Sequence, residues 1–110
     1  MSVEQLDVID VISTDRSGQV VLTVSDHLDW SDTVQHQNIL QAKLNKYLAF
    51  VESGEILESY PDAKGRPVVL KVVFKFRPDQ LGFEFLAKTK AVINSAGFSF
   101  RHEVFAESSG

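Results

Sequence analysis

The hydrophobic residues of this chain change their spacing along the sequence, and this change limits the folds that the chain can adopt. Within residues 33–53 they recur every three to four positions, which places on one helical face Leu40, Leu44, Tyr47, Leu48 and Val51. Gly54 follows directly and can end a helix in the left-handed conformation. This segment is therefore predicted to be a long amphipathic helix.

Other segments alternate with a period of two residues, which is typical of strands. Residues 7–14 and 19–25 flank a turn-like segment at 15–18 and are predicted to form a β-hairpin. Residues 67–77 form a strongly β-forming run, in which one face carries Val68, Leu70, Val72, Phe74 and Phe76. Residues 55–60 are interpreted as a short partner strand, joined to that run by a turn.

A second helix is predicted over residues 79–96, with Gly97 as its stop. Its expected buried face consists of Phe85, Leu86, Thr89, Val92, Ile93 and Ala96. Residues 98–105 are predicted to form the last strand, with one face made of Phe98, Phe100, His102 and Val104. We expect His102 to face the core or its margin.

The predicted order is β-β-α-(β)-β-α-β, in which the strand in brackets is optional. This order predicts an α+β fold, a two-layer sandwich with both helices on one face of a mixed four- or five-stranded sheet. The link through the second helix is long enough for a parallel crossover. Residues 1–110 are expected to form one globular domain with loose termini at 1–5 and 106–110.

Composition narrows the classes of function. The chain has 110 residues, no cysteine and three histidines, so neither thiolate chemistry nor a transition-metal centre is expected. Its net charge of −4 argues against nucleic acid as a partner. No apolar run is long enough for a membrane span, and no leader pattern opens the chain. We therefore expect a cytoplasmic protein without a cofactor.

Residues 25–32 concentrate the chemically capable side chains at the entry of the first helix. One interpretation is structural: Asp29 or Asp32 caps the helix, and Trp30 covers the sheet edge. The other is a small binding or catalytic site for a hard cation or a proton transfer. Its candidate residues are Asp26, His27, Asp29, Trp30, Asp32 and His36. The spacing matches neither a calcium loop nor a His-Glu-x-x-His zinc helix, which favours the structural interpretation.

The outward face of the predicted sheet mixes apolar and basic side chains, namely Val21, Val69, Lys71, Val73 and Lys75. The phenylalanines of the long strand fall on the opposite face, so a stacking platform for single-stranded RNA lacks its rings. A mixed face of this kind is instead a candidate interface for a two-fold homodimer.

Several motifs resemble those of a small uncharacterised bacterial single-domain family, a domain of unknown function. They are Val8-Ile9-Asp10, Ser25-Asp26-His27-Leu28-Asp29-Trp30, Leu40-Gln41-Ala42-Lys43-Leu44-Asn45, Glu52-Ser53-Gly54-Glu55, Tyr60-Pro61 and Gly65-Arg66-Pro67. The motifs cover most of the chain. The resemblance implies a bacterial cytoplasmic setting and carries no activity.

Two hypotheses of function follow. The first is a non-enzymatic protein-interaction module, either homodimeric through the outer sheet face or bound to another protein. The alternative is a small ligand- or metal-binding protein, or a weak enzyme, centred on residues 26–32. The absence of a catalytic signature favours the first.

Overall fold

The computed structural model describes residues 11–104. The strands are β1 (Val11–Thr14), β2 (Val20–Asp26), β3 (Val68–Phe74) and β4 (Ser99–Val104). The helices are α1 (Thr33–Glu52), α2 (Glu55–Ser59) and α3 (Gln80–Ser95), with a short 3₁₀ helix, η1, at Pro61–Ala63. The predicted strand residues 7–10 and Phe105 lie outside the described residues.

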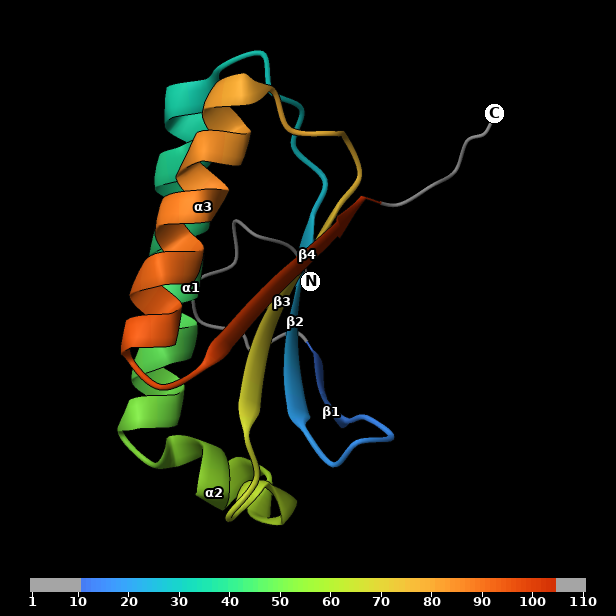
Figure 1. Cartoon of the computed structure of the whole chain (residues 1–110), viewed down its shortest axis with the longest axis vertical. Helices are drawn as coiled ribbons and strands as arrows, with labels where there is room; N and C mark the ends of the chain where they lie inside the picture. Colours follow the sequence, from blue (N-terminus) through green and yellow to red (C-terminus); the bar gives the residue numbers. More distant parts are fainter. Residues whose placement is uncertain (1–10, 105–110) are drawn as a thin grey trace.

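The four strands form a mixed sheet in the order β1-β2-β3-β4. β1 pairs with β2 antiparallel, whereas β2 with β3 and β3 with β4 are parallel. The parallel pairs need crossovers, and α1 and α3 supply them on the same side of the sheet (Figure 1). The predicted α+β architecture, with two long helices against a mixed sheet, is confirmed.

The core lies between the sheet and the two long helices. The inward residues of β2 and β3 are fully buried: Val20, Leu22, Val24, Leu70, Val72 and Phe74. Leu40, Leu44 and Tyr47 of α1 pack against them, and the Tyr47 hydroxyl donates to the carbonyl oxygen of Thr23 at 3.1 Å. Alternation along the strands therefore sets which face the helices cover.

The prediction of a strand at residues 55–60 is wrong, because this segment forms α2 and leads into η1. Gly54 takes a φ of 87°, which ends α1 and lets the chain turn directly into a new helical turn. Ile56 is buried against the core, and the acidic Glu55 and Glu58 lie in the first turn of α2. Their position complements the helix dipole, which favours helix over strand here.

The last strand is less buried than its alternation predicts. Phe100 is buried, but His102 and Val104 are exposed. β4 is an edge strand, paired only with β3 in the described sheet. The ring of His102 still contacts Phe74 and Phe83, at centroid distances of 6.0 and 6.1 Å, so it lies at the margin of the core. Phe76 lies beyond the end of β3 and is also exposed.

None of the helices within residues 11–104 combines the length and apolar character needed to cross a membrane.

Candidate functional site

The clearest polar feature inside the molecule is a hydrogen-bonded pair, Asp26 with His36. Asp26 ends β2 and His36 lies in the first turns of α1, and their side chains are 0% and 2% exposed. The Nε2 atom of His36 lies 2.5 Å from Oδ2 of Asp26, and its Nδ1 atom lies 2.9 Å from the carbonyl oxygen of Asp29. Both ring nitrogens therefore have a partner within the chain.

The chemistry of these partners fixes where the protons lie. A carbonyl oxygen only accepts, so Nδ1 of His36 carries a proton and donates to Asp29. The short contact between Nε2 and Asp26 then holds a second proton, on the imidazole or on the carboxyl group. The pair consequently shares one proton in a place closed to solvent.

Asp26 is held on both carboxyl oxygens. Its Oδ1 atom accepts a hydrogen bond from the backbone N–H of Leu28 at 3.0 Å, while Oδ2 faces His36. Burial raises the pKa of Asp26 above its ordinary value of 3.8, and the hydrogen bond from His36 opposes this rise in pKa. The carboxyl group thus joins the end of β2 to α1.

Trp30 closes this pair from one side. Its ring stacks on His36 with centroids 3.7 Å apart and planes inclined by 23°. Its Nε1–H donates to the carbonyl oxygen of Phe76 at 3.2 Å, beyond the end of β3. Its ring also lies against Gly82, where an added Cβ atom would be 3.0 Å from Cζ3 of Trp30. Trp30 therefore joins the β2–α1 loop to the loop before α3 and to α3 itself.

The other acids of the segment serve separate backbone groups. Asp32 is the N-cap of α1, as predicted, and accepts from the N–H of Gln35 at 3.1 Å. Asp29 accepts from the hydroxyl and the N–H of Ser31, and the hydroxyl bond is the main cause that lowers the pKa of Asp29. His27 is exposed. Residues 11–104 contain no group of three or more His, Cys, Asp or Glu residues suited to a metal ion.

A link between the two long helices was missed by the sequence reasoning. The hydroxyl of Thr33, the first residue of α1, donates to Oδ2 of Asp79 at 2.6 Å, and Oδ1 of Asp79 accepts from the N–H of Gly82. The Thr33 hydroxyl and the Gly82 N–H lower the pKa of Asp79. The sequence predicts that the second helix begins at Asp79, but nothing in it identifies Thr33 as a partner 46 residues away.

The outer sheet face has less exposed apolar surface than its sequence predicts. Val21 and Val69 are 5% and 1% exposed, whereas Val73 is partly buried and Lys75 exposed. The ammonium group of Lys71 lies 3.3 Å from a carboxylate oxygen of Glu103 on β4. The exposed part of this face is therefore mostly charged, and part of the charge is neutralised by neighbouring strands.

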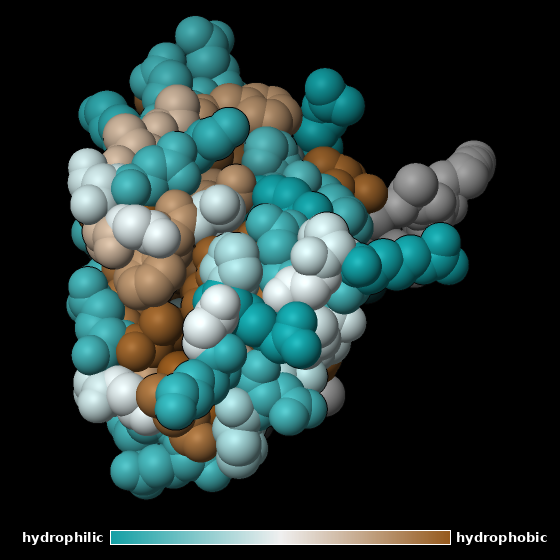
Figure 2. Space-filling model, turned by 60° about the horizontal axis from the view of Figure 1, so that its bottom comes forward, coloured by the Kyte–Doolittle hydropathy of each residue, from teal (hydrophilic) through white to brown (hydrophobic). Residues whose placement is uncertain are grey.

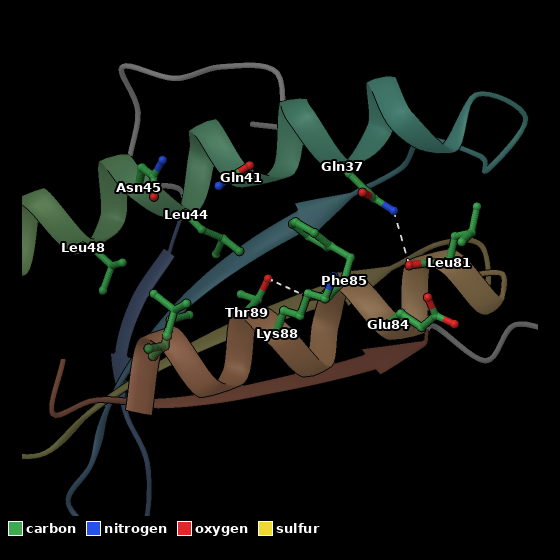
Figure 3. A pocket seen from close by; sticks show the side chains of 12 residues that line it. Gln37, Gln41, Leu44, Asn45, Leu48, Leu81, Glu84, Phe85, Lys88 and Thr89 are labelled. Carbon is green, nitrogen blue, oxygen red and sulfur yellow. Dashed lines mark hydrogen bonds between the residues drawn. The ribbon is translucent and has the colours of Figure 1, made fainter. Parts of the chain in front are cut away.

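A concave surface with both apolar and polar lining residues lies on the helix layer. A groove of about 370 Å³ runs between α1 and α3 (Figure 3). Leu44 and Phe85 point into it, and Gln41 and Asn45 follow its α1 side. The amide of Gln37 donates to the carbonyl oxygen of Leu81 at 3.3 Å and closes one end. We call this surface the α1–α3 groove; its complete lining is Gln37, Gln41, Leu44, Asn45, Leu48, Leu81, Glu84, Phe85, Lys88, Thr89, Val92 and Ile93.

The apolar arc of α3 is wider than the face that the core covers. Leu86 and Ile93 are buried as predicted, but the expectation that Val92 lies in the core is wrong, since it is 62% exposed. Leu81 is 55% exposed at the other end of the groove. The end of the molecule that carries α2 also shows hydrophobic atoms recessed among hydrophilic ones (Figure 2). The helix layer therefore keeps apolar surface in contact with solvent.

Comparison with known proteins places the chain without giving it an activity. No curated protein and no solved structure matches it. A family model does match, over residues 1–106, which is nearly the whole chain. The protein therefore belongs to DUF6572, a family of unknown function.

Proposed function

We propose that this protein is a non-enzymatic protein-interaction module that binds through the α1–α3 groove. The observation that carries the proposal is the exposure of Leu81 and Val92 at the two ends of a groove floored by Leu44, Phe85 and Ile93. Exposed apolar side chains scattered singly are ordinary, but a contiguous apolar groove with a polar rim is typical of a binding surface.

The geometry around Asp26 supports this choice over a site at residues 26–32. A general base or a metal ligand needs a free lone pair that faces a substrate or an ion. Both ring nitrogens of His36 are engaged within the protein, and Trp30 covers the ring. The carboxylates of Asp26, Asp29 and Asp32 bind three different backbone N–H groups. This arrangement fits an internal anchor for the entry of α1.

The outer sheet face is the other surface considered for self-association, and it fits less well. Interface centres are depleted in charge and enriched in apolar side chains. Here Val21 and Val69 are buried, while Lys75 and Arg101 are exposed. The helix layer has the more suitable composition.

A photocrosslinking experiment tests the proposal. A benzophenone amino acid is placed at Val92, inside the groove, and in a matched control at Lys90, which is exposed outside it. We expect one discrete crosslinked product from position 92 in cells, absent from position 90 and lost when Leu81→Glu is added. No product, or equal products from both positions, would contradict the proposal.

The alternative function has its own test, which uses melting curves. Under the proposal, calcium, magnesium and zinc ions leave the melting temperature unchanged, because the side chains of Asp26 and His36 are closed to solvent and hydrogen-bonded within the chain. A rise with one of these ions, abolished by Asp29→Asn, would restore the ligand-binding hypothesis.

A further inference from the structure

We infer that the occupant of the α1–α3 groove is helix α3 of a second copy of this chain, which lies antiparallel to the first across a two-fold axis. This inference rests on the proposed function, because it names the partner of the same groove. The charges of the groove lining and their positions along α3 support it.

The charges of the lining are balanced. Among the lining residues, Glu84 and Lys88 are charged, one of each sign, on a chain whose net charge is −4. Within residues 11–104 neither side chain forms an ion pair. A strongly acidic or basic partner would leave one of these charges unmatched, whereas a partner that carries one charge of each sign matches both.

The order of residues along α3 is self-complementary in the antiparallel direction. The groove side of the helix reads Leu81, then Glu84 and Phe85, then Lys88, then Val92. At 1.5 Å per residue, Leu81 and Val92 are about 16 Å apart along the axis. A two-fold axis midway between them sets Leu81 of each copy at the level of Val92 in the other.

The same axis pairs the charges. Lys88 of one copy comes to the level of Phe85 in the other, next to Glu84, and the reverse contact forms at the symmetry-related position. The Leu81–Val92 contact and the Glu84–Lys88 ion pair therefore each form twice, as an isologous interface requires. On α1, Gln41 and Asn45 lie along the rim of the groove and can hydrogen-bond the flanks of the incoming helix.

Charge-swap variants test the inference, because each variant should dimerise poorly alone and should dimerise well only with the other variant. Glu84→Lys gives two lysines and Lys88→Glu gives two glutamates on the groove side of α3, so each variant repels a copy of itself. Mixed one to one, they restore both ion pairs. Lys90→Glu is the control, since it makes the same charge change at an exposed position outside the groove.

Sedimentation measurements at low salt give the readout. The wild type and Lys90→Glu are expected to be dimers of the 12.3 kDa chain at ~100 μM. Each single charge-swap variant is expected to dimerise at least ~10-fold more weakly. The one-to-one mixture of the two variants is expected to dimerise as strongly as the wild type. A monomeric wild type at this concentration, or single swaps that dimerise as well as the wild type, would overturn the inference.

The crosslinking experiment separates this failure from failure of the proposed function. If the wild type is monomeric and position 92 crosslinks to a different protein, the groove is a binding surface but its occupant is not a second copy of this chain. A monomeric wild type with no product at position 92 overturns both.

Discussion

The His36 imidazole stands 2.5 Å from the Asp26 carboxylate, in a site where both side chains are almost fully closed to solvent. Ten residues of sequence separate them, and the pair connects the end of β2 to the first turns of α1. Burial of polar groups is tolerated when each has its hydrogen-bonding partner. The pair therefore fixes how α1 enters the fold.

Removal of the Asp26 side chain should be much more damaging than loss of its charge. Asp26→Ala leaves His36 Nε2 and the Leu28 N–H without partners, so the free energy of unfolding should fall by about 3–5 kcal/mol. Asp26→Asn can donate to Nε2 and accept from Leu28, so we expect a loss of about 1 kcal/mol. Urea titrations measure both. Equal losses would show that the charge, rather than the shared hydrogen bond, stabilises this site.

The pH dependence of stability should have opposite signs at two aspartates. Burial raises the pKa of Asp26, so its contribution is present below the unfolded value of 3.8 and is lost as the pH rises through the folded pKa. The Thr33 hydroxyl lowers the pKa of Asp79, so its contribution is present above 3.8 and is lost as the pH falls through the folded pKa.

Unfolding titrations at several pH values check this contrast. Relative to Asp26→Asn, the wild type should gain stability as the pH falls through the folded pKa of Asp26 towards 3.8. Relative to Asp79→Asn, it should lose stability as the pH falls below 3.8 through the folded pKa of Asp79. If the stability difference between wild type and variant changed in the same direction for both aspartates as the pH falls, the burial assigned to Asp26 would be contradicted.

Gly82→Ala should destabilise the protein although it replaces glycine inside a helix. The exchange alone favours the helix by about 1 kcal/mol. However, the new Cβ atom would lie 2.9 Å from Cβ of Pro78 and 3.0 Å from Cζ3 of Trp30, and overpacking of this kind costs about 1–3 kcal/mol. We therefore expect a net loss, which Trp30→Phe should reduce in a double-mutant cycle. A gain in melting temperature would show that Trp30 does not pack against this turn.

Two neighbouring residues of α3 should respond differently to truncation. Ile93 is 1% exposed and Val92 is 62% exposed. Ile93→Ala should lower the free energy of unfolding by about 2–5 kcal/mol. Val92→Ala should lower it by less than about 0.5 kcal/mol when measured near 1 μM, far below the concentration at which we expect dimers. Comparable losses at that concentration would mean that Val92 belongs to the core and that the groove is closed.

The long elements could be predicted because their sequences are long enough to show a period. The hydrophobic residues from Val20 to Val24 alternate as in a strand, and those from Leu40 to Val51 recur with the spacing of a helix. The sequence therefore indicates both the type of each element and its buried face. The segment at residues 55–59 is too short for any period to show, and its helix depends on Gly54 and on the burial of Ile56. Short elements of this kind are decided by tertiary contacts.

The candidate site could be predicted in part. The density of acids before α1 correctly indicated a helix cap, and Asp32 provides it. The pairing of Asp26 with His36 depends on how α1 crosses the sheet, which local sequence does not specify. Likewise, the helical period groups Val92 with Ile93, but only the placement of α1 determines which of the two is covered.

The concentration dependence of backbone amide NMR shifts shows whether the α1–α3 groove is the contact surface, because it locates that surface residue by residue. On dilution from about 500 μM to about 20 μM, we expect shifts at Gln41, Glu84, Lys88 and Val92, with none at Lys75. Shifts confined to the outer face of β2 and β3 or to residues 26–36, or no shifts at all, would contradict it.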